Sequence, residues 1–431
     1  MSARRTVLIV SYYFAPSPAV GAKRFSFLAR EFERLGYDVH VITHEMREWT
    51  YGKADSSLPV AGRIHRCDSI RLPLPGKGFF ARAINAVLRK LLAPVGFEYF
   101  WARAATRKAL EVARDLPPGI VIATSPAHAA ILAGGRIADS LGWPLILDYR
   151  DPWSAYEWPS WRRGKVTQWF ARRLEQSLVR QSDARVLNTP AMRDWFEKFF
   201  PHSPGARNFV IPNGFDAAPA ASAPDTTGPI EIVHAGEIFA GRTLVPVLRA
   251  MQRVAARHPG RELRLTTYGD LPAAELQRIR AASLEKLVQV RPRIPFDQLF
   301  AALQRAHLLL AVVSDHMLYS TPYKVYDYMA TGRPILGLAP IGAALFNLLA
   351  DSGAGQCLEP GDETGIETAL EKLLCGDASP VRARVDRFRW SNLALQYRMV
   401  IETAAGAPAP APVPDDATQS ISDSTAINKS G

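Results

Sequence analysis

The sequence predicts an α/β protein built from two doubly wound, Rossmann-like domains that face a central cleft. Short apolar runs alternate with helix-like segments in two separate series, which is the pattern of parallel sheets covered by helices on both faces. The chain of 431 residues, with 48% hydrophobic and 22% charged composition, is also long enough to form two cores. A single domain is therefore not expected.

The first series opens with a βαβ unit. Val7–Ser11 is a short apolar strand, apolar residues repeat at helical spacing over Phe25–Leu35, and Val39–Thr43 is the second strand. Further strands are expected at Val121–Thr124, Leu145–Asp148 and Arg185–Asn188. The loop after the first strand carries Gly21 but no Gly-x-Gly-x-x-Gly, so a dinucleotide fingerprint is absent.

The second series follows a connector rich in Gly, Pro, Ala and Ser. Its strands are expected at Ile230–Ala235, Arg264–Tyr268, Val288–Arg291, Leu308–Val313, Ile335–Gly337 and Gln356–Leu358. We accordingly expect an N-terminal domain at 1–213, a linker at 214–228, a C-terminal domain from 229 to 385 and a disordered tail at 404–431. Ligands of such folds bind beyond the carboxyl ends of the strands, which directs attention to the loops that follow them.

The segment from Ser320 to Gly337 carries the most informative pattern. Ser320 or Thr321 suits a helix N-cap, Pro322 suits the first helical position, and Gly332 followed by a proline ends the helix before an apolar strand. Backbone N–H groups and the positive end of the helix dipole bind anions at such a start. The segment therefore predicts a site for a phosphorylated ligand.

Two charged residues of this segment strengthen that interpretation. Lys324 and Asp327 are three positions apart and should share one helical face. The ammonium of Lys324 is suited to a phosphate, and the carboxylate of Asp327 can accept hydrogen bonds from ribose hydroxyls. Together they indicate a nucleotide-sugar site. The alternative is an exposed ion pair on an ordinary surface helix.

Two further groups follow strands of the first series. His128 lies after Val121–Thr124, at the end of that strand expected to face the cleft, although a lone histidine is often structural. Arg150 and Asp151 belong to a crowded run that follows the next strand. Arg150 can pair with Asp148, which leaves Asp151 for an acceptor hydroxyl, and an ion-pair network that uses all three residues is the alternative.

These motifs resemble retaining glycosyltransferases of family 4, the group 1 glycosyltransferases, over most of residues 6–403. In that family a proline-lysine loop precedes an acidic residue on a helix and a Gly-x-Pro turn, as in the segment that begins at Ser320. The resemblance implies the GT-B fold, in which a terminal helix, here at 386–403, crosses back to the first domain. It also implies a nucleotide-diphosphate sugar as the donor, with no metal ion and no cofactor.

The residues and this resemblance together define the candidate site. The expected donor-binding residues are Gly21, Gly236, Arg242, Arg293, Ser320, Thr321, Tyr323, Lys324 and Asp327. The expected catalytic residues are His128, Asp151, Arg242 and Lys324, and the expected acceptor-side residues are Lys23, Arg24 and Arg150. Glu237 stands where the family more commonly has Arg, and Tyr319 stands where it often has a second acid. Arg24, Lys324 or Arg293 is expected to supply the missing cation.

The net charge of +11 calls for anionic partners. Nucleic acid is not expected, because no RNA-binding aromatic signature, zinc finger or helix-turn-helix pattern occurs. Residues 77–108 mix basic residues with Phe, Leu and Trp, including Phe79 and Trp101, which suits an anionic inner membrane surface. The alternative is a helix packed on its own domain.

The three cysteines show neither a disulfide framework nor a zinc pattern. With no signal-peptide core and no apolar run long enough to span a bilayer, we expect a cytoplasmic protein, either free or peripheral on the inner membrane face. The predicted function is transfer of a sugar from a nucleotide-diphosphate donor to a saccharide or lipid-linked acceptor of the envelope or a polysaccharide. A sugar-nucleotide epimerase of the same fold and a non-catalytic membrane-associated scaffold are the alternatives.

Overall fold

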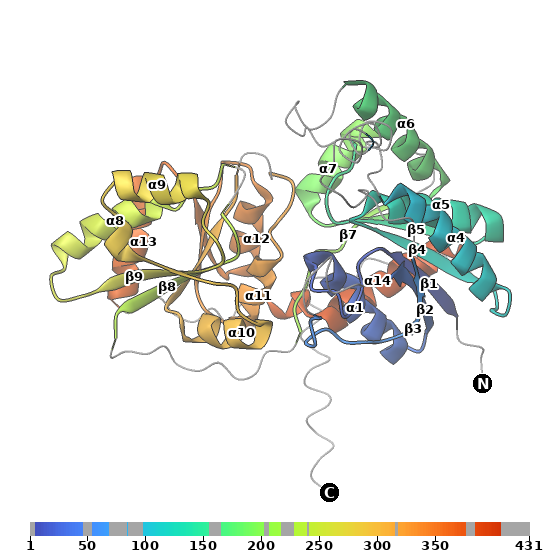
Figure 1. Cartoon of the computed structure of the whole chain (residues 1–431), viewed down its shortest axis with the longest axis horizontal. Helices are drawn as coiled ribbons and strands as arrows, with labels where there is room; N and C mark the ends of the chain where they lie inside the picture. Colours follow the sequence, from blue (N-terminus) through green and yellow to red (C-terminus); the bar gives the residue numbers. More distant parts are fainter. Residues whose placement is uncertain are drawn as a thin grey trace, which may run out of the picture.

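The computed structural model describes residues 5–45, 54–68, 84, 98–154, 165–201, 207–216, 228–238, 241–314, 318–375 and 384–406. Two α/β domains lie next to each other, with the N-terminal domain on the right in Figure 1. The predicted disordered tail, from residue 407 onward, and residues 217–227 of the predicted linker lie outside the described residues.

The N-terminal domain contains a seven-stranded parallel sheet in the order β3-β2-β1-β4-β5-β6-β7. Its strands are β1 (Thr6–Ser11), β2 (Asp38–His44), β3 (Arg63–Cys67), β4 (Gly119–Ser125), β5 (Leu145–Tyr149), β6 (Ala184–Leu187) and β7 (Arg207–Val210). Its helices are α1 (Val20–Arg34), α4 (Tyr99–Ala113), α5 (His128–Leu141), α6 (Lys165–Gln181) and α7 (Pro190–Phe199). In the register, Val7 lies opposite Val39 on one side and Ile120 on the other.

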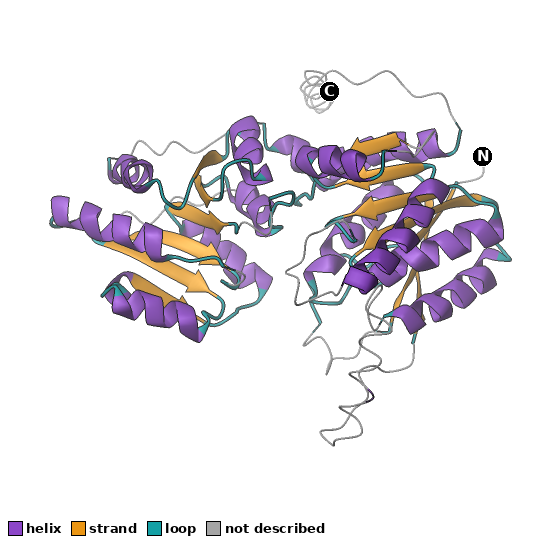
Figure 2. Ribbon diagram, turned by 90° about the horizontal axis from the view of Figure 1, so that it is seen from above, coloured by secondary structure: helices purple, strands orange, loops and turns teal. Residues whose placement is uncertain are grey.

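The C-terminal domain contains a six-stranded parallel sheet in the order β10-β9-β8-β11-β12-β13. Its strands are β8 (Ile230–Ala235), β9 (Leu263–Tyr268), β10 (Val288–Arg291), β11 (Leu308–Val312), β12 (Ile335–Leu338) and β13 (Gly355–Leu358). The helices are α8 (Val245–Arg257), α9 (Ala273–Ala281), η1 (Glu285–Leu287), α10 (Phe296–Arg305), α11 (Lys324–Thr331), α12 (Ala344–Ser352) and α13 (Glu363–Leu374). Helices cover both faces of each sheet (Figure 2). The central strands are therefore buried on both sides.

The chain then returns to the first domain. After η3 (Asp386–Phe388), α14 (Trp390–Ala404) packs along α1, so the red end of the chain lies against the blue helix in Figure 1. The rings of Trp390 and Phe27 stack with centroids 5.8 Å apart, and Tyr397 meets Phe25 and Phe32 edge-on. The predicted fold class, with two doubly wound domains and a crossing helix, is confirmed.

Two strands of the N-terminal sheet were not predicted. β3 and β7 form its two edges, and no side chain of either strand is fully buried. An edge strand with an exposed face has no continuous apolar run, so it lacks the signal that identifies the central strands.

The described part of the predicted membrane segment packs on its own domain. Trp101 on α4 is fully buried, with its ring 5.0 Å from that of Tyr12. The prediction that Trp101 enters a bilayer is therefore wrong, because the apolar face of α4 covers the sheet. Arg103 and Arg107 are exposed on the same helix. Residues 77–83 and 85–97 lie outside the described residues.

Candidate functional site

Helix α11 holds the carboxyl end of strand β8. Lys324, its first residue, donates from Nζ to the carbonyl of Ala235 at 2.6 Å and lies 3.0 Å from Nε2 of His234. One turn later, the hydroxyl of Tyr328 accepts a hydrogen bond from the N–H of Ala235 at 2.8 Å. The next residue, Gly236, has φ of +97°, which favours glycine. Side chains one turn apart on α11 therefore position the loop that follows β8.

The electrostatics of this cluster favour an anion. Burial lowers the pKa of Lys324 well below its usual value, and the nearby charge of Arg242 lowers it further. Burial also lowers the pKa of His234 well below its usual value, with Lys324 adding to the effect. Nδ1 of His234 lies 2.9 Å from the carbonyl of Leu310, so a neutral ring can donate there and accept from Lys324. Two neighbouring positive charges that are shielded from solvent repel each other. A bound anion would stabilise both of them.

Three predicted donor residues thus come together. A Cβ built on Gly236 would lie 3.6 Å from Nζ of Lys324, so the ammonium lies beside the glycine backbone. Arg242 is buried and close enough to lower the pKa of both Lys324 and His234. The arrangement offers two cations and the backbone around Gly236 at the end of a parallel strand, where phosphates bind in related folds.

The helix itself begins later than predicted. Tyr323 is the N-cap of α11 and makes no side-chain capping bond, so the prediction that Ser320 or Thr321 caps the helix is wrong. The loop before α11 is held by the rest of the molecule instead. The hydroxyl of Thr189 in the first domain donates to the carbonyl of Tyr319, and that of Tyr323 donates to the carbonyl of Gly214 at 3.0 Å. Ser320 and Thr321 are buried in this loop.

A cation, Arg293, lies beside Glu237. Arg293 follows β10 and forms an ion pair with Glu237, with its guanidinium 2.6 Å from the carboxylate. Glu237 directly follows Gly236, so this ion pair brings the predicted donor residue Arg293 next to the loop that follows β8. Both side chains are exposed and therefore able to rearrange around a ligand.

Lys23 and Asp327 connect the two domains. Nζ of Lys23 on α1 lies 3.1 Å from the carboxylate of Asp327 on α11, and 4.1 Å and 4.7 Å from the ring centroids of Phe296 and Tyr323. Burial raises the pKa of Asp327, and Lys23 opposes this rise. A cavity of about 200 Å³ is lined by these four side chains among others. A predicted acceptor-side residue and a predicted donor residue thus face each other across the cleft.

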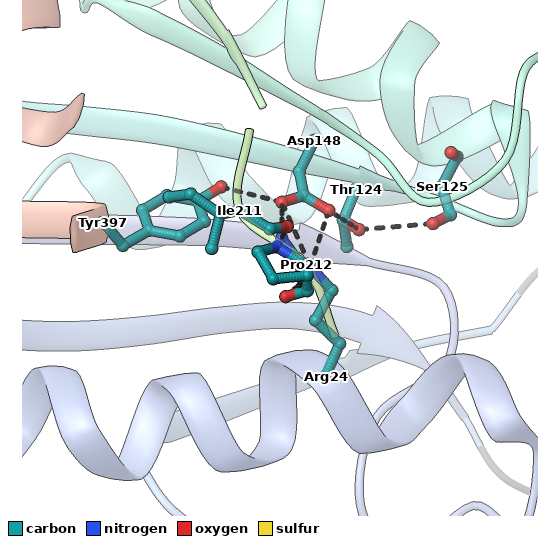
Figure 3. Close-up of polar contacts among 7 residues, drawn as sticks. All are labelled: Arg24, Thr124, Ser125, Asp148, Ile211, Pro212 and Tyr397. Carbon is teal, nitrogen blue, oxygen red and sulfur yellow. Dashed lines mark hydrogen bonds and ion pairs between the residues drawn. The ribbon is translucent and has the colours of Figure 1, made fainter. Parts of the chain in front are cut away.

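Arg24, the neighbour of Lys23, is directed into the protein (Figure 3). Its guanidinium donates to both carboxylate oxygens of Asp148, with the Nη2 contact at 2.9 Å, and to the carbonyls of Ile211 and Pro212 at 3.0 and 2.7 Å. The hydroxyl of Tyr397 donates to the same carboxylate at 3.2 Å. The prediction that Arg24 faces the acceptor is therefore corrected, because this buried network joins α1, β5, the interdomain connection and α14.

Arg150 does not pair with Asp148, because Arg24 and Thr124 occupy that carboxylate. Its guanidinium lies 3.7 Å from the carboxylate of Asp151 instead. Burial raises the pKa of Tyr323 well above its usual value, and Arg150 opposes this rise from the other domain. Arg150 and Asp151 thus follow β5 at the edge of the sheet that faces α11.

His128 is the first residue of α5 and lies at the carboxyl end of β4. Its ring stacks on Trp153, with centroids 4.9 Å apart and an interplanar angle of 9°. Trp153 is fully buried, so this contact fixes the plane of the imidazole. Gly21 lies at the start of α1, where a Cβ would come within 2.9 Å of the ring of Tyr13. A side chain at Gly21 would therefore displace the first loop.

Sequence reasoning missed the residues that join the first domain to Tyr319. Besides the hydroxyl of Thr189, the ring of Trp195 on α7 stacks on Tyr319 with centroids 5.2 Å apart. Thr189 followed by Pro190 is a recognisable helix start. That signal, however, indicates a cap and contains no information on a contact 130 residues along the chain.

Across the described ranges, no helix is long and apolar enough to cross a membrane. The same ranges contain no group of three or more His, Cys, Asp or Glu side chains placed to hold a metal ion.

Comparison with protein families gives two matches. Residues 21–214 match the model described as a glycosyl transferase 4-like domain, and residues 230–375 match the model described as glycosyl transferases group 1. The two matches follow the two sheets of the structure.

Comparison with single proteins adds three relatives. Over 246 residues the chain is 26% identical to a phosphatidyl-myo-inositol mannosyltransferase of Mycolicibacterium smegmatis, a match that covers 54% of this chain and 61% of that protein. Sucrose-phosphate synthase from Thermosynechococcus elongatus aligns with a TM-score of 0.64 at 16% identity, over 94% of this chain and all of that one. HepE of Anabaena, in complex with UDP, aligns with a TM-score of 0.58 at 13% identity over 93% of this chain and 100% of that one. The two structures show that the fold is GT-B.

Proposed function

We propose that this chain, which belongs to the group 1 glycosyltransferases, uses a nucleotide-sugar donor and transfers the sugar with retention of configuration to an envelope or polysaccharide acceptor. One observation carries the proposal: Lys324, Arg242 and the backbone of Gly236 come together at the end of β8. A donor diphosphate beside them would find two cations.

The chemistry that this arrangement supports is mainly electrostatic. Negative charge grows on the diphosphate as the bond between the sugar carbon and the phosphate oxygen breaks. Lys324 and Arg242 stabilise that charge more in the transition state than in the bound donor. A phosphate oxygen accepts the proton of the acceptor hydroxyl, whose oxygen forms the new bond on the same face of the sugar. Neither a metal ion nor a cofactor takes part in this scheme.

Asp327 and Arg293 contribute to donor binding in the same proposal. The carboxylate of Asp327 accepts hydrogen bonds from the ribose hydroxyls, which requires its bond to Lys23 to lengthen or break. Lys23 then lies close to the donor, on the acceptor side. Arg293 leaves Glu237 for the nucleotide, and the loop around it contacts the base through backbone groups. Ser320, Thr321 and Tyr323 form the wall of this pocket.

The acceptor occupies the side formed by the first domain. His128, held by Trp153, lies near the transferred sugar, and Asp151 accepts a hydrogen bond from the acceptor hydroxyl. Arg150 lies close to both Asp151 and Tyr323, and we place it at the junction of donor and acceptor. Closure of the two domains around the bound donor limits water and thus donor hydrolysis.

The relatives support the finer parts of the proposal. The mannosyltransferase relative is named for a phosphatidyl-myo-inositol acceptor, which favours a lipid-linked acceptor here, and the Anabaena structure holds UDP. With a lipid-linked acceptor, the proposed location is the inner face of the cytoplasmic membrane, and the positive net charge of the chain suits that surface.

A donor panel tests the proposal. Calorimetry with UDP-, GDP-, ADP- and dTDP-sugars should find one donor that binds, and Lys324→Ala should weaken it by roughly 10- to 100-fold, the value of a hydrogen bond to a charged group. Lys372→Ala, an exposed lysine on α13, is the matched control and should bind like wild type.

The reaction is followed by diphosphate release in the presence of membrane lipid extract. Release that depends on the extract supports transfer. Conversion of the donor without an acceptor would indicate the epimerase, and failure of every donor to bind would indicate the scaffold.

A further inference from the structure

Helix α6 exposes large apolar side chains. Val166, Trp169 and Phe170 are 69%, 51% and 53% exposed, although single exposed apolar residues are common on protein surfaces. Their spacing of three and four places them on one helical face near the start of the helix. The opposite face is buried, with Leu178 and Val179 in the core of the first domain. The exposed face is thus a patch rather than a scatter of single residues.

The patch has a positive border. Lys165, Arg172 and Arg173 are exposed on the same helix, and the guanidinium of Arg173 lies 4.7 Å from the ring of Trp169. Arg180 adds a fourth exposed cation, whereas the one acid of α6, Glu175, is buried. An aromatic and aliphatic face edged by cations, on a helix whose one acid is buried, is complementary to an anionic lipid surface.

The patch is also connected to the cleft. Arg172 lies 4.0 Å from the ring of Phe199 on α7, that ring stacks on Trp195, and Trp195 stacks on Tyr319 beside the donor loop. In Figure 1, α6 and α7 lie together at the top of the N-terminal domain.

A second connection leads to the acceptor side. Buried Glu175 of α6 accepts a hydrogen bond from the backbone N–H of Ser154 at 2.8 Å. Ser154 directly follows Trp153, which stacks on His128. The helix that carries the patch is therefore joined by contacts to both sides of the candidate site.

We infer that the exposed face of α6, formed by Lys165, Val166, Trp169, Phe170, Arg172 and Arg173, docks the protein on a bilayer that contains anionic phospholipid. Trp169 and Phe170 enter the boundary between headgroups and acyl chains, and the arginines contact the phosphates. This inference rests on the proposed function only in that a lipid-linked acceptor would explain why the protein binds a bilayer. Binding to the bilayer itself requires no donor.

The arginine-lined groove on α4 and α5 is a weaker candidate for this role. Arg103, Arg107, Arg114 and Arg136 line a hollow of about 590 Å³ there, and phosphate groups would suit it. The large aromatic residue of α4, Trp101, is buried in the core, however. The described part of that surface therefore supplies charge without an exposed aromatic anchor.

Vesicle co-sedimentation of the full-length protein tests the inference. Wild type should bind vesicles of phosphatidylcholine with phosphatidylglycerol, bind phosphatidylcholine alone weakly, and lose binding as salt rises. Replacing both aromatic residues, Trp169→Ser with Phe170→Ser, should weaken partition by roughly tenfold or more through lost apolar contact. Arg172→Gln with Arg173→Gln should weaken binding only to the anionic vesicles.

Matched controls come from the C-terminal domain. Ile341, with 73% of its surface exposed, tests the loss of an exposed apolar residue as Ile341→Ser, and Arg261→Gln with Arg305→Gln tests the loss of two exposed cations. Both controls should bind vesicles like wild type. Unchanged thermal unfolding and donor calorimetry would show that the α6 variants are folded.

The outcomes separate the two proposals. If wild type does not bind anionic vesicles, or the α6 variants bind as well as the controls, the docking surface is wrong whatever the donor panel shows. If the α6 changes alter the oligomeric state by light scattering and leave vesicle binding unchanged, the patch is an interface between copies of the chain. If vesicles bind and no donor does, docking stands and the transferase proposal fails.

Discussion

At the scale of single residues, the surroundings of Lys324 change its chemistry. Burial and Arg242 lower its pKa, so in the free protein its ammonium is easier to deprotonate than that of an exposed lysine. A bound diphosphate has the opposite effect, because negative charge raises the pKa of a neighbouring ammonium. Donor binding should therefore be coupled to protonation.

We expect net proton uptake when the donor binds, in the pH range between the lowered pKa of free Lys324 and its raised pKa in the complex. Affinity should accordingly fall as pH rises through that range. Calorimetry in two buffers that differ in ionisation enthalpy measures the uptake. Lys324→Met should abolish it, and Lys372→Met should leave it intact. Identical heats in both buffers for wild type would contradict this account.

Asp148 was expected to pair with Arg150, and in the fold it pairs with the buried Arg24 instead. Its carboxylate accepts from Arg24, Thr124 and Tyr397 within the protein. Asp148→Ala would leave a buried guanidinium without its counter-charge, and we expect it to lower the free energy of unfolding by about 3–5 kcal/mol. Denaturant unfolding measures this loss.

Two variants sharpen the test of Asp148. Asp139→Ala removes an exposed carboxylate of α5 and should change stability by less than about 0.5 kcal/mol. The double variant Arg24→Met with Asp148→Leu removes both charges and should be more stable than Asp148→Ala alone. Equal unfolding midpoints for Asp148→Ala and wild type would show that the network contributes little.

At the scale of elements, α14 completes the core of a domain that precedes it by more than 170 residues. Trp390 is 1% exposed and stacks on Phe27, whereas Leu395 on the same helix is 41% exposed. Trp390→Ala should lower the free energy of unfolding by about 3–5 kcal/mol through the cavity it creates. Leu395→Ala should change it by less than about 0.5 kcal/mol.

Denaturant unfolding of both α14 variants provides the measurement. A small loss for Trp390→Ala, similar to that of Leu395→Ala, would mean that α14 is not part of the cooperative core of the first domain. That result would separate the helix from the domain on which it packs.

The observed helices and strands also show which sequence signals were sufficient to predict an element. The central strands of both sheets were predicted because their residues are apolar almost throughout. β3 and β7 were missed because an edge strand carries polar side chains such as Arg63 and Arg207. The start of α11 was misplaced because Ser320 and Pro322 are good helix-start residues, yet contacts from Thr189 and Tyr323 hold that segment as a loop.

At the scale of the whole molecule, the pair of Lys23 and Asp327 joins the two domains across the cleft. Lys23→Ala would remove an ion pair and the contacts of its ammonium with Phe296 and Tyr323. We expect the domains of the free variant to separate, which small-angle scattering would record as a larger radius of gyration. Lys286→Ala, an exposed lysine of the second domain, should scatter like wild type.

The same contact should respond to pH. Burial raises the pKa of Asp327, so acidification should neutralise it, and open the cleft, at a higher pH than for an exposed aspartate. Superimposable scattering of Lys23→Ala and wild type at neutral pH would show that the ion pair does not control closure.

The sequence by itself determined the fold class, the family and the order of the strands along the chain, because these follow from apolar runs and local motifs. It also identified Lys324, Arg242 and Gly236 as candidates, and the structure brings them together. Only the tertiary structure decided that Arg24 is buried beside Asp148 while its neighbour Lys23 reaches the other domain. Adjacent residues on a helix face different surroundings, and those surroundings are formed by segments distant in the chain, which no local pattern specifies.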